Sequence, residues 1–197
     1  MDGKPIAAGA FMADDYCKKC HADTYQDWYH SVHHLSSFNN PVYRFSVLET
    51  RQVGMKRDGN VRASRGCAGC HDPVPFLSGA FDDPDYDHVN DPTAHAGITC
   101  TVCHAITNVN STIGNGDYTI EAPQHYPLAQ SDHALLSWFS DQLVKARPDF
   151  HKKSFMKPLL RTTEFCSTCH KVSLPVALNH YKEFLRGQDH YNSYLLS

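Results

Sequence analysis

Several common sequence features are missing from this chain of 197 residues, and each absence excludes a class of protein. No run of 18 apolar residues exists, so we expect no segment that spans a bilayer. Residues 1–13 lack a basic region followed by an apolar stretch, so they are not a signal peptide. The 18 basic and 21 acidic side chains nearly balance, which gives no reason to expect nucleic acid or an anionic membrane surface as a partner.

Motifs of the common enzyme classes are also missing: nothing resembles a serine triad, a phosphate-binding loop or a nucleotide fingerprint. The apolar share of 41% is slightly below the value of about 45–50% that is typical of globular chains. The core that the chain can build by itself is therefore thin. By contrast, eight cysteines and 14 histidines are many for this length.

All eight cysteines fall in four copies of one pattern, Cys-x-x-Cys-His, and none is left over. Two thiols three residues apart lie on one face of a helical turn, where each can bond a vinyl group of the same porphyrin. The adjacent histidine then reaches the iron as its proximal ligand. The spacing predicts four covalent c-type haems, attached to Cys17 and Cys20, Cys67 and Cys70, Cys100 and Cys103, and Cys166 and Cys169, with His21, His71, His104 and His170 on the irons.

Two other uses of paired cysteines compete with this interpretation. Eight thiolates would fill two four-cysteine zinc sites, and a Cys-x-x-Cys unit also occurs in redox disulfides. Neither use requires a histidine after every second cysteine, and chance would rarely place one there four times among 14 histidines in 197 residues. The pattern therefore favours haem.

Ten histidines remain after the four proximal ligands are assigned, which is enough to place a second histidine on every iron. The methionines beyond Met1 are only three, at positions 12, 55 and 156, so methionine cannot serve every haem. Histidine in place of methionine lowers the reduction potential. We expect mostly bis-histidine haems of low potential.

The coarse secondary structure is predicted to be mainly helical, with little β structure, in a fold packed around haems. Asp14 or Asp15 can cap a turn that carries the first motif and continues over 22–37. Ser131 or Asp132 can cap an amphipathic helix that stops before Pro148, and a further helix is expected from 176 to about 186. One short hairpin is predicted over 111–120, and the Asp-rich segment 76–92 is expected to be a loop.

We treat residues 1–197 as a single tetrahaem domain, because the unequal spacing of the motifs argues against a tandem repeat. Covalent haem attachment of this kind occurs outside the cytoplasm, so a periplasmic or extracellular location is expected. With no signal peptide in 1–13, either a leader has been removed or the chain is a domain excised from a longer multihaem protein.

Three segments carry a resemblance to a known family. The run from Cys17 through Trp28-Tyr-His-Ser-Val-His33 is similar to the tetrahaem cytochrome c-554 family, in which Cys-x-x-Cys-His is followed by Trp-x-x-Ser-x-His. The segments 97–104 and 164–191 are similar to other periplasmic multihaem cytochromes. In that family the last histidine of Trp-x-x-Ser-x-His ligates a different haem, and the haem of the second motif is five-coordinate.

The resemblance implies that His33 is a distal ligand, with His34 and His30 as the neighbouring alternatives. Four further histidines are candidates for distal ligation: His95 precedes the third motif, His125 lies between two prolines, and His151 and His190 follow later in the chain. We expect His88 to be solvated, and His30, His133 and His180 to be surface or core residues. An open iron position, if one exists, is expected at the haem of His71.

Three functions fit this pattern. The first is an electron carrier that works with redox partner proteins. The second is an oxidoreductase, or its electron-input domain, in which one five-coordinate haem handles a small nitrogen or oxygen compound. The third is a subunit of an extracellular cytochrome filament or another homo-oligomeric or multihaem assembly. Catalysis also needs positioned acids or bases, and no such constellation is legible, so we favour the carrier over the enzyme.

Overall fold

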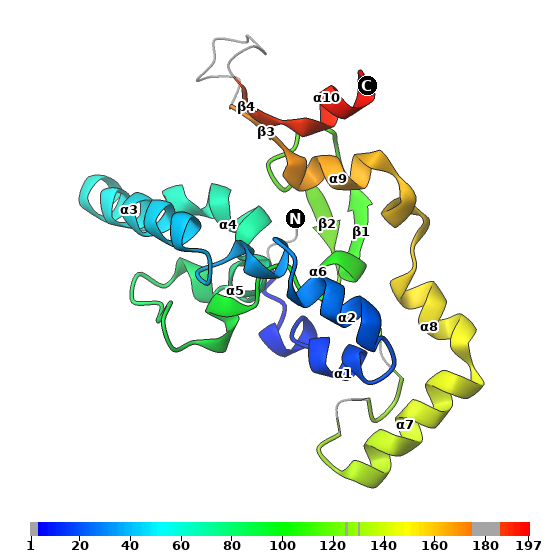
Figure 1. Cartoon of the computed structure of the whole chain (residues 1–197). Coiled ribbons are helices and arrows are strands. Elements are labelled where there is room, and N and C mark those ends of the chain that lie inside the picture. The colour runs from blue at the N-terminus through cyan, green and yellow to red at the C-terminus, as the bar shows by residue number, and fades with distance from the viewer. Residues whose placement is uncertain (1–3, 125, 130, 175–185) are drawn as a thin grey trace.

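A computed structural model describes residues 4–124, 126–129, 131–174 and 186–197, and short helices make up most of them (Figure 1). The α-helices are α1 (Asp14–Lys18), α2 (Ala22–Tyr29), α3 (Pro41–Asp58), α4 (Arg65–His71), α5 (Pro73–Ser78), α6 (Cys100–Ala105), α7 (Ala134–Ala146), α8 (Pro148–Phe155), α9 (Thr163–His170) and α10 (His190–Leu195). The strands are β1 (Ile106–Val109), β2 (Tyr118–Ile120), β3 (Lys171–Ser173) and β4 (Arg186–Asp189). The predicted mainly helical fold with little strand is confirmed.

The longest helix of the described residues, α3, has clear start and stop signals. The Asn40 side chain accepts hydrogen bonds from the backbone N–H groups of Val42 and Tyr43, and Pro41 occupies the first turn, where no N–H partner is needed. The helix ends at Gly59, whose φ of 69° is left-handed and suits a residue without a side chain. One face of α3 is buried and the other is open to solvent.

Two sheets of two antiparallel strands are present among the described residues. In the first, Ile106 pairs with Ile120 and Val109 with Tyr118. The predicted hairpin over 111–120 is therefore correct in its second strand and wrong in its first, because residues 111–117 form the connection and the first strand follows α6 directly. The second pair, β3 with β4, was not predicted.

The predicted helices agree with the structure in part. The helix expected to stop before Pro148 is α7, although its N-terminal cap position is His133 rather than Ser131 or Asp132. The helix expected to run on from the first motif is interrupted between α1 and α2. The helix expected from 176 lies outside the described residues up to 185, and Arg186 already belongs to β4.

The segment expected to be a loop is only partly one. Its first residues end α5, and a 3₁₀ turn (Ala80–Asp82) follows. Asp87 accepts backbone N–H bonds from Val89 and Asn90, while Asp91 caps the next 3₁₀ turn (Pro92–His95). The acidic side chains of this segment therefore hold its turns.

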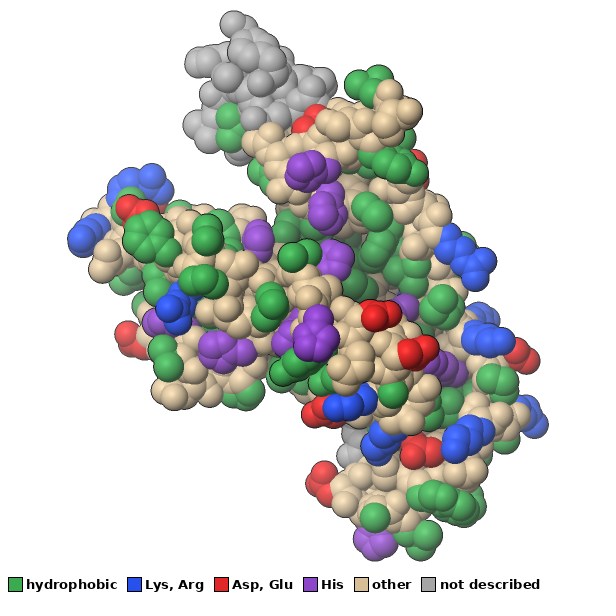
Figure 2. Space-filling model, viewed as in Figure 1, with side chains coloured by type: hydrophobic (Ala, Val, Ile, Leu, Met, Phe, Trp, Pro, Cys, Tyr) green, Lys and Arg blue, Asp and Glu red, His purple; other side chains and the backbone are tan. Residues whose placement is uncertain are grey.

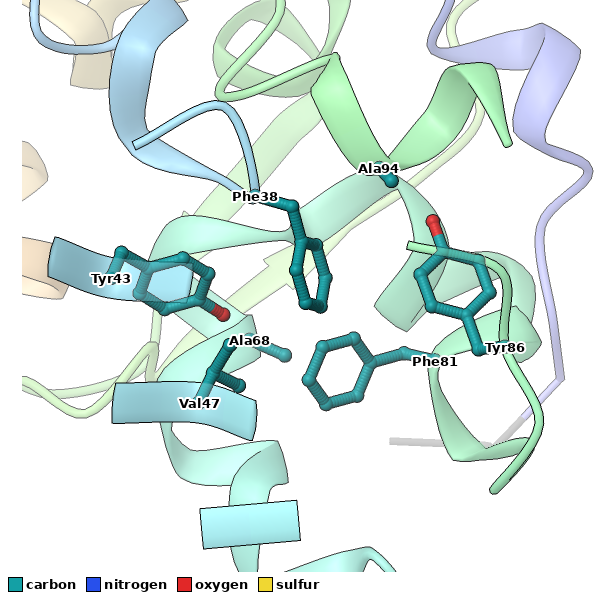
Figure 3. Packing of buried hydrophobic residues seen from close by; sticks show 7 residues of the cluster. All are labelled: Phe38, Tyr43, Val47, Ala68, Phe81, Tyr86 and Ala94. Carbon is teal, nitrogen blue, oxygen red and sulfur yellow. The ribbon is translucent and has the colours of Figure 1, made fainter. Parts of the chain in front are cut away.

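The buried apolar residues form two separate clusters. The first packs α3, α4 and the loop after α5 together (Figure 3), and it consists of Phe38, Tyr43, Val47, Ala68, Phe81, Tyr86 and Ala94. The second joins the N-terminal segment to α5 and α6, with Phe11, Val74, Ala96, Val102 and Ala105. Within the described residues, no helix is long and apolar enough to cross a membrane.

Candidate haem-binding site

The four Cys-x-x-Cys-His motifs lie on or beside helical turns, as haem attachment requires. The second, third and fourth motifs lie within α4, α6 and α9, and their histidines are at or next to the C-terminal end of each helix. The first motif crosses the break between α1 and α2, with Cys17 in α1 and His21 at the start of α2. Each pair of thiols therefore lies about one turn from its histidine.

The cysteines of different motifs also come together. The thiols of Cys17 and Cys100 lie close enough that their interaction lowers the pKa of Cys17 and raises that of Cys100, and Cys169 and Cys70 form a second such pair. The thiol of Cys103 lies close enough to Cys169 to interact with it electrostatically. A hydrogen bond of 2.8 Å from the backbone N–H of Cys100 to the Asp14 carboxylate ties the first motif to the third. The first motif is thus joined to the third, and a contact of the Cys70 thiol with the Thr168 carbonyl joins the second motif to the fourth.

Two of the motif histidines are held through the ring nitrogen that faces away from the iron position. Nδ1 of His71 donates to the Ser36 carbonyl at 2.9 Å, and Nδ1 of His104 donates to the Phe155 carbonyl at 2.5 Å. This leaves Nε2 of each ring free for a metal and makes the imidazole a stronger ligand. Burial also lowers the pKa of His104, which favours the neutral form that metal ligation needs.

Two motif histidines face a second histidine from a distant part of the chain. The ring centres of His21 and His151 are 6.2 Å apart, and those of His170 and His33 are also 6.2 Å apart. An iron held between two imidazoles by bonds of about 2.0 Å keeps the ring centres about 6 Å apart. Both pairs therefore have the separation that two imidazoles on one iron would show.

Histidines gather along a hollow between the part that carries α3 and α4 and the part that carries α9 and α10 (Figure 2). Elements far apart in the sequence supply the histidine pairs, since His33 follows α2 while its neighbour His170 ends α9. The residues present thus fit covalent haem, because two thiols, a proximal imidazole and, in two cases, a facing imidazole occur together.

The turn that carries His33 is held by contacts on both sides. The His33 carbonyl accepts from the backbone N–H of Ile98, whose own carbonyl accepts from the Trp28 indole at 2.8 Å. Gly97, the residue before Ile98, has φ 62°. A side chain at this position would come within 2.2 Å of the His34 carbonyl oxygen. A glycine is therefore required at this close approach.

The two alternatives to His33 have other surroundings. The ring of His34 packs against the rings of Trp28 and Tyr29, at 4.6 and 4.7 Å, and its Nδ1 donates to the Tyr29 carbonyl. The exposed His30 meets the edge of Tyr29. Only His33 of the three has its ring within contact of a motif histidine among the described residues.

His190 also lies 6.2 Å from His170, but in a different way. The two residues are next to the paired positions Lys171 and Asp189 of β3 and β4. Neighbouring residues across antiparallel strands place their side chains on the same face. We therefore expect His190 to lie beside His170 rather than across an iron from it.

The other histidines named from the sequence are placed as follows. His95 is exposed, and its Nε2 donates to the Val89 carbonyl at 3.0 Å, so only Nδ1 is left for a metal. His125 lies outside the described residues, as does His180. His88 is half-buried with its ring 5.3 Å from that of Phe38, so the expectation that it is solvated is wrong. Packing against an aromatic core residue explains the difference.

The second motif has surroundings that the sequence did not indicate. The ring of His71 is stacked on that of Tyr43, with centres 4.5 Å apart and planes at 15°. The Tyr43 hydroxyl donates to the carboxylate of Asp72, which is fully buried. Burial raises the pKa of Asp72 to about 7. No sequence pattern marks Tyr43, which reads as an ordinary core residue of a helix.

A zinc site would require its ligands to be grouped around one point. Structural zinc sites gather four cysteine or histidine ligands around one ion. Among the residues that the structure describes, which include all eight cysteines, there is no group of three or more side chains that could hold a metal ion.

Comparisons with known proteins agree with the haem interpretation. Residues 16–105 match the family model for cytochrome c554 and c-prime. A penta-haem cytochrome c552 from Thermochromatium tepidum has a similar fold, with a TM-score of 0.54 at 18% identity over 84% of this chain. The matched region is 47% of that protein, so this chain spans about half of it. No curated protein matches the chain. The predicted resemblance to multihaem c-type cytochromes is confirmed.

Proposed function

We propose that this multihaem c-type cytochrome carries electrons through four covalently bound haems, most of them ligated by two histidines. The observation that carries the proposal is the pair of facing imidazoles at the first and fourth motifs, each with ring centres 6.2 Å apart. An iron with two imidazoles has no position for a substrate and can only pass electrons. The protein's part is to supply axial ligands and burial that tune each potential.

The contacts between motifs support a relay. Interacting thiols link the first motif to the third and the fourth to the second, and Cys103 of the third motif interacts electrostatically with Cys169 of the fourth. Haems attached at adjoining cysteines lie near one another, so an electron can move between them in short steps. We propose the haem order first, third, fourth, second, with the second at one end of the relay.

For the distal ligands, we propose His151 on the iron of His21 and His33 on the iron of His170. His190, His95 and His125 are then left for the haems of His104 and His71. We propose the haem of His71 as the site of any open position, since Tyr43 is the ring that packs on this histidine and no second histidine ring contacts it among the described residues. At least three haems are expected to be bis-histidine.

Location and partners follow from the cofactor. Multihaem c-type cytochromes are typically exported, and we propose a periplasmic or extracellular site for this one. Its partners are redox proteins that donate to and accept from the relay. The same relay could also extend across a larger multihaem assembly or a homo-oligomer.

Two measurements test the proposal. The intact mass under denaturing conditions should exceed that of the polypeptide by four haem units, whereas three haems or zinc-releasable thiols would contradict it. Carbon monoxide titration of the fully reduced protein should then show binding to one haem at most. Binding to two or more haems would favour an oxidoreductase over a carrier.

A further inference from the structure

Beside the second motif, three buried polar side chains form a connected group. The Tyr43 hydroxyl donates to one oxygen of Asp72, the residue that follows His71. The Arg51 guanidinium lies near both groups and interacts with them electrostatically. It also donates to the carbonyls of Phe81 and Asp83, at 2.7 and 2.6 Å.

We propose that Tyr43, anchored by Asp72, is a positioning residue that fixes the His71 ring and thereby sets the reduction potential of the second haem. The proposal rests on the function proposed above, because it concerns one haem of the relay. Tyr43 acts through His71 and touches no iron position itself.

Two contacts act on the His71 ring from different directions. The Tyr43 ring lies flat against it, with centres 4.5 Å apart, and prevents it from turning. In the orientation so fixed, Nδ1 points at the Ser36 carbonyl, 2.9 Å away. A hydrogen bond from Nδ1 strengthens an imidazole as a ligand, and a stronger ligand favours the oxidised iron. Tyr43 therefore keeps the potential of this haem low.

Packing alone does not account for the group. Asp72 has no exposed surface, and its second oxygen, Oδ1, has no hydrogen-bond partner among the described residues. A buried carboxyl with an unpaired oxygen lowers stability, and an apolar residue would fill the same space without that cost. The hydrogen bond to Asp72 does, however, hold the hydroxyl end of Tyr43 in place. The face of the same ring packs against His71.

The other described motif histidines lack such a support. His21 and His170 have histidine rings as their neighbours at 6.2 Å, and His104 meets the edge of Phe155 at 6.4 Å. The rings of His21 and His151 are also nearly parallel, at 10°, but a stack as close as 4.5 Å is specific to the second motif among the described residues. We expect its loss to change one haem and leave three unchanged.

The test compares two variants of Tyr43 with a matched control. Tyr43→Leu removes both the stack and the hydroxyl, whereas Tyr43→Phe keeps the ring and removes only its anchor. Tyr86→Phe is the control, since Tyr86 lies in the same core and its hydroxyl bonds Thr93 at 2.7 Å, but it contacts no motif histidine. Redox titration and ferric EPR are recorded for each purified holoprotein.

We expect one of four midpoint potentials to rise and one EPR signal to shift in Tyr43→Leu, with a smaller change in Tyr43→Phe and none in Tyr86→Phe. The inference would be overturned if Tyr43→Phe, with all four haems attached, kept all four midpoint potentials and the EPR spectrum of the unmutated protein. Equal changes in the Tyr86→Phe control would also overturn it, by showing a general effect of the core. A haem count below four in the unmutated protein would instead contradict the proposed function.

Discussion

The first and fourth motifs differ from the second in what lies against their histidine rings. His21 and His170 each face a histidine brought from another part of the chain, with ring centres 6.2 Å apart, whereas His71 is stacked on Tyr43 at 4.5 Å. The five-residue motif is the same in each case. Identical five-residue motifs therefore acquire unequal surroundings for their histidine rings, because the neighbour of each ring comes from elsewhere in the fold.

The largest effect is expected from removing the facing histidines. His33→Ala and His151→Ala should each convert one haem of four from low to high spin, because the iron loses its second imidazole. The double variant should convert two haems. The first and fourth sites would then each have an open iron position, as proposed for the second site. Visible and EPR spectra of the ferric protein measure this.

His133→Ala is the matched control for these variants. His133 is exposed and is not expected to ligate a haem, so the low-spin haems of the unmutated protein should all persist. An unchanged spectrum in His33→Ala would remove His33 as a ligand and make His34 or His30 the candidate. It would also end the contrast between the fourth motif and the second.

A smaller effect should follow from disturbing the turn that presents His33. In Gly97→Ala the new methyl group meets the His34 carbonyl, and the left-handed backbone is strained, so we expect a loss of about 2–3 kcal/mol of unfolding free energy. Part of one haem should also become high spin as His33 moves from His170.

Chemical denaturation and EPR check the Gly97 prediction together. Gly9→Ala serves as its control, since nothing lies within 4 Å of a side chain at Gly9. Full stability and four unchanged haems in Gly97→Ala would mean that the close approach at this turn does not hold His33.

The smallest effect should appear at Arg51, which supports the second motif's core without touching a haem ligand. Arg51→Met leaves the Phe81 and Asp83 carbonyls without a donor, and we expect a loss of about 1–3 kcal/mol of unfolding free energy with all haem spectra nearly unchanged. Arg57→Met removes a solvent-exposed ion pair with Asp58 and should have no measurable effect on stability. A comparable loss in both variants would contradict the burial argument.

Local sequence signals predicted some elements well. The apolar spacing around Leu135 and Phe139, ended by Pro148, indicated α7, and its observed end at Ala146 agrees. The predicted first strand of the hairpin, at the start of 111–120, was wrong. A turn-rich segment between two β-prone triplets does not determine which residues before the turn pair with the second strand. In the structure the chain becomes extended at Ile106, directly after α6, and Ile106 pairs with Ile120.

The four attachment motifs, the mainly helical fold and the excess of histidines follow from the sequence by itself, because a thiol, a second thiol and an imidazole at fixed spacing are local features. The partner of each imidazole is not local. Only the tertiary structure brings His33 to His170, His151 to His21 and Tyr43 to His71, since each contact joins segments whose approach depends on the packing of whole helices. Ten spare histidines offered too many combinations for spacing along the chain to choose among them.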